Sequence, residues 1–296
     1  MAVRLPEAKG LHLRRTLDSG QTFRWSWETD AGGQEIAAGI IGRRVVRLAQ
    51  DAQGLWLISP GTSEARDVLL RYLGIASADG TGIGSIEDTL AKDPVLARIL
   101  PRTRGIGLLA QDPWEVLISF VISQNNNIPK IVKSIERLCR ALGEPLDAGA
   151  YAFPSPARLA SAHPRTLAAS LLGYRAPYVR AAARHVADGR LDLEALRHMP
   201  ESSAREVLCG VPGIGDKVGD CILLFGLGHM TAFPVDVWVR RAVERLYFRN
   251  RPRPIAQIRV FARDRFGSLA GYAQQHLYAY ARAHLRTERR HGIRKA

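Results

Sequence analysis

Lys217 stands where a lysine could act as a nucleophile. It follows the pentapeptide Val-Pro-Gly-Ile-Gly, in which Gly213 and Gly215 can take backbone angles that other residues avoid. We expect one helix to end near Cys209, a tight hairpin to follow, and a second helix to begin at Asp216 or Lys217. The dipole at a helix N-terminus disfavours a cation, and a neutral amine is a nucleophile. Taken alone, Lys217 could equally be a solvated surface residue.

The hairpin itself predicts contact with a nucleic-acid backbone. Its glycines leave main-chain N–H groups uncovered at Gly213 and Gly215, and the dipole of the next helix adds to their pull on a phosphate. This pattern is typical of a helix–hairpin–helix clamp, which holds DNA without reading its sequence. A glycine-rich connection between two helices, with no ligand, is the alternative.

A carboxylate follows the lysine by nineteen residues. Asp236 comes after a Pro-Val pair and precedes an amphipathic helix whose apolar side carries Val239, Val243 and Leu246. By itself Asp236 would be interpreted as a helix N-cap. Because a two-helix hairpin can bring Lys217 and Asp236 to one cleft, the pair predicts an amine and a carboxylate that act on the same substrate.

The charge balance favours a polyanionic partner. Lys and Arg number 42 against 28 Asp and Glu, so the 296 residues carry a net charge of +14 and a pI of about 10.3. This suits DNA or RNA, although a basic but unrelated enzyme would look the same. Three isolated cysteines without a CxxC pair fit a reducing cytoplasm and offer no metal cluster. We find no signal peptide and no apolar run long enough to span a membrane.

The chain has two parts that differ in the spacing of their apolar residues. Residues 1–105 are expected to form a β-rich domain: alternation at 23–27 and 40–48 and an apolar run at 55–58 predict strands, a helix follows at 63–73, and 74–84 is expected to be an exposed connection. Residues 106–285 carry apolar side chains at helical spacing, and 286–296 form a basic tail expected to be flexible. The expected helices are 113–122, 128–142, 156–163, 164–172, 177–188, 191–197, 202–209, 217–227, 237–247, 255–266 and 272–284.

Five segments together resemble a known family. The hairpin with Lys217 and the Pro-Val-Asp that ends at Asp236 resembles the helix–hairpin–helix DNA glycosylase superfamily. The superfamily members with an iron–sulfur cluster carry four C-terminal cysteines, which are absent here after Cys221. The remaining segments resemble the 8-oxoguanine DNA glycosylase branch: Leu-Asp-Ser-Gly-Gln-Thr-Phe-Arg-Trp at 17–25, Ser-Gln-Asn-Asn-Asn-Ile at 123–128, Leu-Gly-Tyr-Arg-Ala at 172–176 and Ala-Gly-Tyr-Ala-Gln at 270–274.

The resemblance implies an α+β fold. It places an antiparallel, TBP-like β domain at 1–105 and a helical glycosylase domain of the HhH-GPD type at 106–285. It also implies the chemistry: Lys217 attacks the sugar C1′ as the base leaves and forms a Schiff base, while Asp236 stabilises the oxocarbenium-like sugar and assists proton transfer. The Schiff base then permits β-elimination, so lyase activity at the abasic site is expected as well.

Four residues match those that hold the damaged base in this family. The main-chain carbonyl of Gly20 would accept the N7–H that distinguishes 8-oxoguanine from guanine, and Gln274 would read the Watson–Crick edge. Cys221, one turn beyond Lys217, would stack on one side of the flipped base, and Tyr278 would stack on the other. A turn glycine at position 20 and a core tyrosine at position 278 are the structural alternatives.

Other matches concern the opposite strand. Base flipping leaves a hole and an orphaned cytosine. Asn125, Tyr174 and Arg175 match residues that fill this hole or bond the cytosine. Lys130 replaces an arginine found in many relatives, so selection for cytosine is expected to be weaker because lysine lacks the bidentate guanidinium.

The resemblance further implies a monovalent cation at the hairpin, held by main-chain carbonyls of Cys209, Val211 and Ile214. Two departures from the family stand out. Trp238 occupies the position of a histidine, and Ala281 occupies the position of the acidic residue that would partner it. Their joint loss leaves neither partner stranded and predicts a phosphate or pocket contact remade with an indole.

The sequence therefore predicts a bifunctional DNA glycosylase/lyase that excises 8-oxoguanine opposite cytosine in double-stranded DNA. We expect it to act as a cytoplasmic monomer that needs no cofactor and no iron–sulfur cluster. A monofunctional glycosylase for alkylated bases such as 3-methyladenine is one alternative, although such enzymes typically lack the lysine. A non-catalytic helix–hairpin–helix DNA-binding protein is the other.

Overall fold

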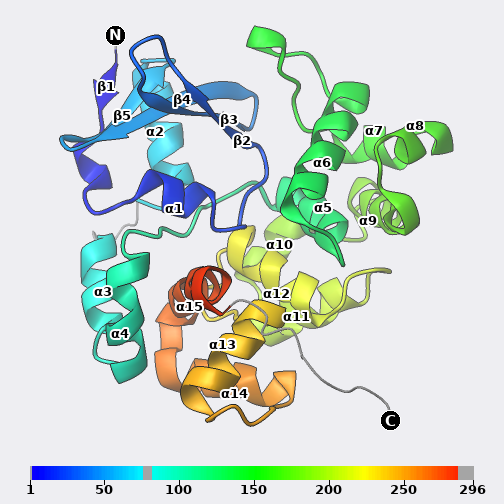
Figure 1. Cartoon of the computed structure of the whole chain (residues 1–296). Coiled ribbons are helices and arrows are strands. Elements are labelled where there is room, and N and C mark those ends of the chain that lie inside the picture. The colour runs from blue at the N-terminus through cyan, green and yellow to red at the C-terminus, as the bar shows by residue number, and fades with distance from the viewer. Residues whose placement is uncertain (1, 76–81, 286–296) are drawn as a thin grey trace, which may run out of the picture.

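The computed structural model describes residues 2–75 and 82–285 and places a β-sheet beside a larger body of helices (Figure 1). The sheet is built from the N-terminal part of the chain, and the helices that follow it surround a central helix near the C-terminal end. The expected α+β fold is confirmed. The tail predicted to be flexible, 286–296, and residues 76–81 of the predicted connection lie outside the described residues.

The sheet has five antiparallel strands in the order β1-β5-β4-β3-β2. Ala37, Leu48 and Leu57 stand opposite one another on three adjacent strands, and each is fully buried. Because successive side chains of a strand point to opposite faces, this row marks the face that packs on the core. The strands are β1 (Val3–Arg4), β2 (Trp25–Thr29), β3 (Glu35–Ile41), β4 (Arg44–Asp51) and β5 (Gly54–Ser59).

The single strand predicted at 40–48 is wrong. The structure has a hairpin there, in which β3 ends at Ile41 and β4 begins at Arg44. Gly42 lies in the turn with φ of 59°, a conformation that glycine adopts without a steric penalty. Apolar residues lie close on both sides of this short turn, so a pattern search joins the end of β3 and the start of β4 into one strand.

The helices begin largely where capping residues and prolines predict. Asp112 accepts a hydrogen bond from the Glu115 N–H (3.0 Å) ahead of α5, and Asn127 accepts one from the Lys130 N–H (3.0 Å) ahead of α6. Three helices, α1, α3 and α4, were not predicted. The bounds are α1 (Leu13–Leu17), α2 (Ser63–Tyr72), α3 (Ile83–Leu90), α4 (Pro94–Thr103), α5 (Pro113–Ser123), α6 (Ile128–Leu142), α7 (Pro156–Ala160), α8 (Pro164–Ala169), α9 (Ala176–Ala187), α10 (Leu193–His198), α11 (Glu201–Cys209), α12 (Asp216–Phe225), α13 (Val237–Tyr247), α14 (Ile255–Phe266) and α15 (Ala270–His284), with short 3-10 helices η1 (Pro6–Ala8), η2 (Asp147–Gly149), η3 (Gly173–Arg175) and η4 (Gly267–Leu269).

Helices α3 and α4 belong to the segment expected to be β-rich, yet they pack on the C-terminal helices. Leu96 of α4 shares one buried cluster with Val239 of α13 and Leu277 of α15. A second contact is polar, because His276 Nδ1 lies 2.9 Å from the Thr103 hydroxyl. Burial lowers the pKa of His276 to about 4, so this imidazole is neutral at physiological pH. The domain boundary at residue 105 stays a prediction.

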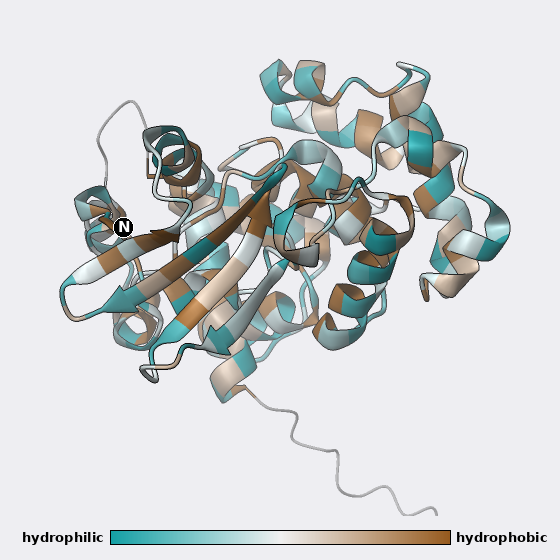
Figure 2. Cartoon of the chain, turned by 90° about the horizontal axis from the view of Figure 1, so that it is seen from above, coloured by the Kyte–Doolittle hydropathy of each residue, from teal (hydrophilic) through white to brown (hydrophobic). Residues whose placement is uncertain are grey.

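The sheet and helix α2 enclose the apolar residues of the N-terminal part. Figure 2 brings the sheet to the front, and its strands change between hydrophobic and hydrophilic colours along their length. Leu55 of β5 and Leu69 of α2 are both buried in this cluster. None of the described helices is both long and apolar enough to cross a lipid bilayer.

Candidate active site

A cavity of about 740 Å³ lies where the end of α5, the start of α12, the start of α13 and helix α15 meet. The loop at residues 20–23 and the start of α6 also contribute to it. It contains both members of the predicted pair, Lys217 and Asp236. Its lining residues are Gly20, Phe23, Phe120, Ser123, Gln124, Asn125, Asn126, Asn127, Ile128, Pro129, Ile131, Gly215, Asp216, Lys217, Val218, Asp236, Val237, Trp238, Tyr278 and Arg282.

Lys217 is half-buried in the first turn of α12, behind the N-cap Gly215. Its ammonium lies 5.1 Å from the centre of the Phe120 ring, so an aromatic face supports the side chain in the cavity. Cys221 follows one helical turn later and is 2% exposed. Burial raises the pKa of the Cys221 thiol to about 12, although the Lys217 charge opposes this. The thiol is therefore neutral and presents soft, polarisable surface rather than a competing nucleophile.

Asp236 is the N-cap of α13, as the simpler sequence interpretation proposed. Its Oδ1 accepts hydrogen bonds from the Trp238 N–H (2.9 Å) and the Val239 N–H (2.8 Å). The same carboxylate also lines the cavity that holds Lys217. Burial raises the pKa of Asp236, while the two N–H donors and the charges of Lys217 and Arg282 act in the opposite direction. Capping therefore fixes the carboxylate at the point where it faces the lysine's cavity.

Helix α12, which carries Lys217, is tied to its neighbours by a buried ion-pair network. The Asp220 side chain is fully buried and lies 2.7 Å from Arg205 Nε of α11 and 2.9 Å from Arg259 Nε of α14. Arg259 also contacts Asp216 at 2.9 Å. Removing one partner of a buried ion pair leaves an uncompensated charge, which costs roughly 3–5 kcal/mol. The network therefore fixes the orientation of α12.

Gly20 and Tyr278 lie next to each other and together form one wall of the cavity. Gly20 has φ of 77°, and a Cβ atom placed there would lie 2.8 Å from the Tyr278 hydroxyl. The adjacent Gln21 holds this loop in place: its amide donates to the Gly107 carbonyl (2.9 Å) and accepts from the Leu109 N–H (2.9 Å). Only glycine suits position 20, because it alone meets both the backbone and the space requirement.

Gln274 and Cys221 are buried and lie outside the lining of the cavity in this structure. The Gln274 amide donates to the Pro234 carbonyl at 3.1 Å. Its Oε1 is buried and has no hydrogen-bond partner among the described residues. A buried amide oxygen without a hydrogen-bond partner raises the free energy of the folded protein, so this atom is suited to accept a hydrogen bond from a bound ligand.

The residues predicted to face the opposite strand gather on the loop after α5. The Asn125 amide donates to the Tyr174 hydroxyl (3.2 Å), and Tyr174 is 54% exposed. Arg175 is buried instead, and its guanidinium donates to the main-chain carbonyls of Gln124 (2.7 Å) and Asn125 (2.9 Å). In this structure Arg175 thus supports the loop. Lys130 is exposed and outside the lining of the cavity.

The hairpin has the geometry expected of its glycines. Gly213 has φ of 87°, and a Cβ atom there would meet the Tyr178 ring at 2.3 Å, so a side chain cannot fit.

A second, more polar hollow of about 370 Å³ lies between the hairpin and the exposed Tyr174. Its lining residues are Gln124, Asn125, Tyr174, Tyr178, Cys209, Gly210, Val211, Pro212, Gly213, Ile214 and Gly215.

The predicted cation site falls on this hollow. Cys209, Val211 and Ile214 all line it. The Val211 carbonyl already accepts the Ile214 N–H (3.0 Å), but a carbonyl oxygen has a second lone pair. Carbonyl oxygens are suitable ligands for a monovalent cation, so these residues fit the group. Within the described part of the chain no cluster of three or more His, Cys, Asp or Glu could hold a metal ion.

Trp238 replaces the expected histidine and makes a different contact. Its indole lies 5.1 Å from the Arg241 guanidinium and also lines the large cavity. Ala281 is fully buried in the α13–α15 cluster.

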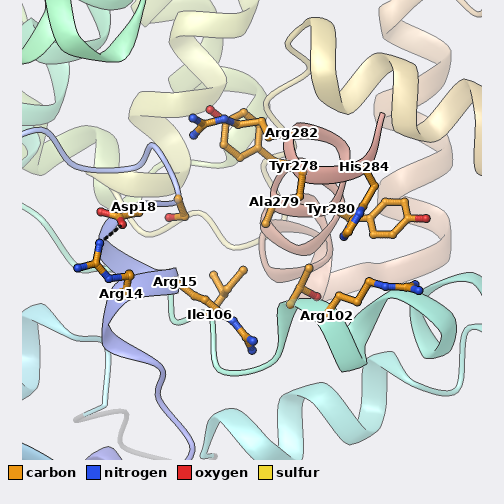
Figure 3. A pocket seen from close by; sticks show the side chains of 13 residues that line it. Arg14, Arg15, Asp18, Arg102, Ile106, Tyr278, Ala279, Tyr280, Arg282 and His284 are labelled. Atoms are coloured by element: carbon orange, nitrogen blue, oxygen red, sulfur yellow. Dashed lines mark hydrogen bonds and ion pairs between the residues drawn. The ribbon is translucent and has the colours of Figure 1, made fainter. Parts of the chain in front are cut away.

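Sequence reasoning missed Arg282, which lies four residues after Tyr278 and stacks on its ring at 5.5 Å (Figure 3). The i, i+4 spacing on one helix was the signal that could have found it.

Comparison with known proteins agrees with this geometry. Residues 3–117 match the model of the 8-oxoguanine DNA glycosylase N-terminal domain, and 118–262 match that of HhH-GPD superfamily base excision DNA repair proteins. The N-glycosylase/DNA lyase of Saccharomyces cerevisiae is 30% identical over 91% of this chain and 83% of its own length.

Two solved structures are similar throughout. MBOgg1, solved with a low-affinity DNA ligand, is 36% identical with a TM-score of 0.86 and coverage of 95% of each chain. The Clostridium acetobutylicum 8-oxoguanine glycosylase/lyase, bound to double-stranded DNA with cytosine opposite 8-oxoguanine, is 32% identical with a TM-score of 0.84, covering 96% of this chain and 98% of the other.

The fold and the hairpin site thus define a base-excision repair protein of the HhH-GPD superfamily. Within it, the chain belongs to the 8-oxoguanine DNA glycosylase family. It is an enzyme of the N-glycosylase/DNA lyase class.

The contact between Gly20 and Tyr278 gives a first test. The variant Gly20→Ala places a methyl group against the Tyr278 hydroxyl and forces a left-handed backbone on alanine, which costs roughly 1–2 kcal/mol. Relief of this strain should displace the Gly20 loop from the cavity wall. A displacement that weakens binding of the transition state by about 1.4 kcal/mol slows single-turnover base release about tenfold, which is the loss we expect.

The double variant Gly20→Ala/Tyr278→Phe serves as the matched control, because it removes the hydroxyl that the methyl group meets. It should recover part of the lost rate. If Gly20→Ala releases the base as fast as the wild type, the Gly20–Tyr278 wall does not shape the substrate site.

Proposed function

We propose that this enzyme excises 8-oxoguanine opposite cytosine from double-stranded DNA, with Lys217 as the nucleophile and Asp236 as its electrostatic partner. The observation that carries the proposal is that these two side chains, nineteen residues apart in the sequence, line one cavity at the N-termini of two helices. The volume of about 740 Å³ is ample for a flipped nucleotide, since ligand sites commonly measure 300–1,000 Å³.

The residues account for the chemistry in order. The Lys217 ammonium first passes a proton to water, and the amine then attacks the sugar C1′. The C1′–N bond to the purine breaks, and the leaving purine takes up a proton from water. Positive charge develops on the sugar during this step, and the Asp236 carboxylate, fixed by two main-chain N–H groups, stabilises that charge without reorganisation.

The lyase step follows from the covalent adduct. Opening of the sugar ring at its oxygen converts the C1′–nitrogen bond into a Schiff base. The Schiff base makes the neighbouring C2′–H acidic. Removal of the C2′ proton then forms a C2′–C3′ double bond and expels the 3′-phosphate. Hydrolysis then releases the aldehyde end and regenerates Lys217. Two carboxylates line the cavity, and Asp216 is paired with Arg259, so we assign the acceptance and return of protons to Asp236.

Base recognition is proposed for the opposite wall. The main-chain carbonyl of Gly20 would accept the extra N7–H of 8-oxoguanine, and the unpartnered Oε1 of Gln274 would accept a donor from the Watson–Crick edge after a small shift. Tyr278 and the neutral Cys221 would flank the base. One such buried hydrogen bond is worth about 1–3 kcal/mol when it is lost, which discriminates between guanine and its oxidised form.

The exposed loop after α5 completes the DNA contact. We propose that Asn125 and Tyr174 enter the gap left by the flipped nucleotide and that Lys130 contacts the cytosine strand. Arg175 would bond the cytosine only after releasing a loop carbonyl, so we assign it to loop support first. The hairpin glycines would hold a backbone phosphate, with a monovalent cation on the carbonyls of Cys209, Val211 and Ile214 as a bridge. We propose that the enzyme works as a cytoplasmic monomer and needs no other cofactor.

The sharpest test of the nucleophile uses borohydride, which reduces a Schiff base to a stable amine. Wild-type protein incubated with an 8-oxoguanine:cytosine duplex should form a covalent adduct, and Lys217→Gln should form none. Lys133→Gln removes an exposed lysine that lies outside the cavity and has no proposed DNA contact, so it is the matched control and should be trapped normally.

Trapping of Lys217→Gln at the wild-type level would overturn the assignment of the nucleophile. A panel of lesions separates the alternatives. Faster release of 3-methyladenine than of 8-oxoguanine would favour an alkylated-base glycosylase, and release of no base would favour a DNA clamp.

The pH dependence tests Asp236. Because burial raises its pKa, activity that needs the carboxylate should fall as the pH drops through a value above the usual aspartate range. The Arg282 charge holds this pKa down, so Arg282→Gln should move the acid limb of single-turnover base release to higher pH. The matched control is Arg241→Gln. Arg241 contacts the Trp238 indole but does not line the cavity, so its loss should leave the acid limb in place. An unmoved limb in Arg282→Gln would show that Asp236 does not govern it.

A further inference from the structure

A third hollow, distinct from the one at the hairpin, adjoins the proposed substrate cavity. It measures about 400 Å³ and lies between α1, α4 and the C-terminal end of α15 (Figure 3). Tyr278 and Arg282 line both hollows, so the two are separated by these side chains. The lining residues are Arg14, Arg15, Asp18, Ser19, Arg102, Thr103, Ile106, Tyr278, Ala279, Tyr280, Arg282, Ala283 and His284.

The cleft has a marked excess of positive charge. Four arginines and one histidine line it against a single carboxylate, that of Asp18. Asp18 is paired with Arg14, which also contacts Glu35 at 2.6 Å. The other three arginines form no ion pair with any residue in 2–75 or 82–285. Three guanidinium groups without an ion pair therefore surround one hollow and can bind an anion.

The unpaired arginines come from three different elements. Arg15 lies on α1, where its guanidinium donates to the Arg104 carbonyl at 2.8 Å. Arg102 lies near the end of α4 and is exposed, and no hydrogen bond joins its side chain to any described residue. Arg282 lies on α15 over the Tyr278 ring. Figure 3 shows the labelled Arg15 and Arg102 on one side of the hollow and Arg282 on the other.

We propose that this cleft binds a backbone phosphate of the DNA strand that carries the flipped nucleotide. The proposal rests on the proposed function and extends it. Guanidinium groups match phosphate oxygens in geometry and charge, and tyrosine hydroxyls such as that of Tyr280 can donate as well. When a nucleotide rotates out of the helix, its flanking phosphates stay at the mouth of the pocket. Arg282 stands between that pocket and the cleft and links the two.

Such a contact carries no sequence or lesion information. It would position the strand so that the flipped sugar meets Lys217, and its contribution would depend strongly on salt. A free nucleotide offers the same phosphate chemistry, so the experiment must separate these two sources.

The test measures duplex binding as a function of salt. Each phosphate contact that is lost makes the slope of log K against log [salt] less steep by about 0.9. We expect Arg102→Ala to lower the slope by about this amount and Arg102→Glu to lower it further, equally on undamaged and lesion-containing duplexes. Across a fourfold change in salt, a slope change of 0.9 corresponds to about a 3.5-fold change in affinity.

Lys92→Ala is the matched control. Lys92 is also exposed, lies just before α4, and is ten residues from Arg102, which is about 15 Å along a helix. It lines no part of the cleft, so its loss should leave the slope near that of the wild type. Thermal unfolding of all variants verifies that they fold.

Equal slopes for wild type, Arg102→Ala and Arg102→Glu would overturn the proposal. Titration with dGMP in the absence of DNA gives the second arm. Binding of dGMP that is lost in Arg102→Ala, with no change in the duplex slope, would assign the cleft to a free nucleotide and likewise overturn the proposal. Base release by the wild type is read separately, so failure of the cleft is distinguishable from failure of the proposed function.

Discussion

The site depends on the burial of one carboxylate at the start of a helix. Asp236 satisfies two main-chain N–H groups of α13 and at the same time lines the cavity that receives Lys217. The N-terminal ends of α12 and α13 therefore converge on one hollow, each contributing its dipole and one functional side chain. A carboxylate that is already oriented by hydrogen bonds needs no rearrangement when positive charge develops in front of it.

Everything around this pair serves to hold two helix ends in place. The Asp220 network ties α12 to α11 and α14, and the buried His276–Thr103 contact ties α15 to α4. The sheet contributes more indirectly, because the loop after α1 brings Gly20 against Tyr278. Gln21 fixes this loop through the main chain near residue 107. The N-terminal part of the chain thus helps to shape the cavity.

The sequence predicted the helical part well because its helices carry strong local signals. The caps Asp112, Asn127 and Asp236 and the apolar spacing of α6, α13 and α14 can be read without tertiary information. The packing of α3 and α4 on α15 could not be predicted, since their apolar residues do not indicate which surface they meet. The hairpin at Gly42 was missed because its turn is short and apolar residues of β3 and β4 lie close on both sides of it. Likewise, the burial of Arg175 and the position of Arg282 depend on contacts between distant segments.

The proposed mechanism requires that Lys217 itself bonds to the sugar, and peptide mapping of the reduced complex identifies the residue that carries this bond. After borohydride reduction with an 8-oxoguanine duplex, proteolysis and tandem mass spectrometry locate the modified residue. The account predicts that the sugar remnant lies on Lys217, in the peptide that begins the α12 helix. A remnant on another lysine or on the N-terminal amine would contradict it.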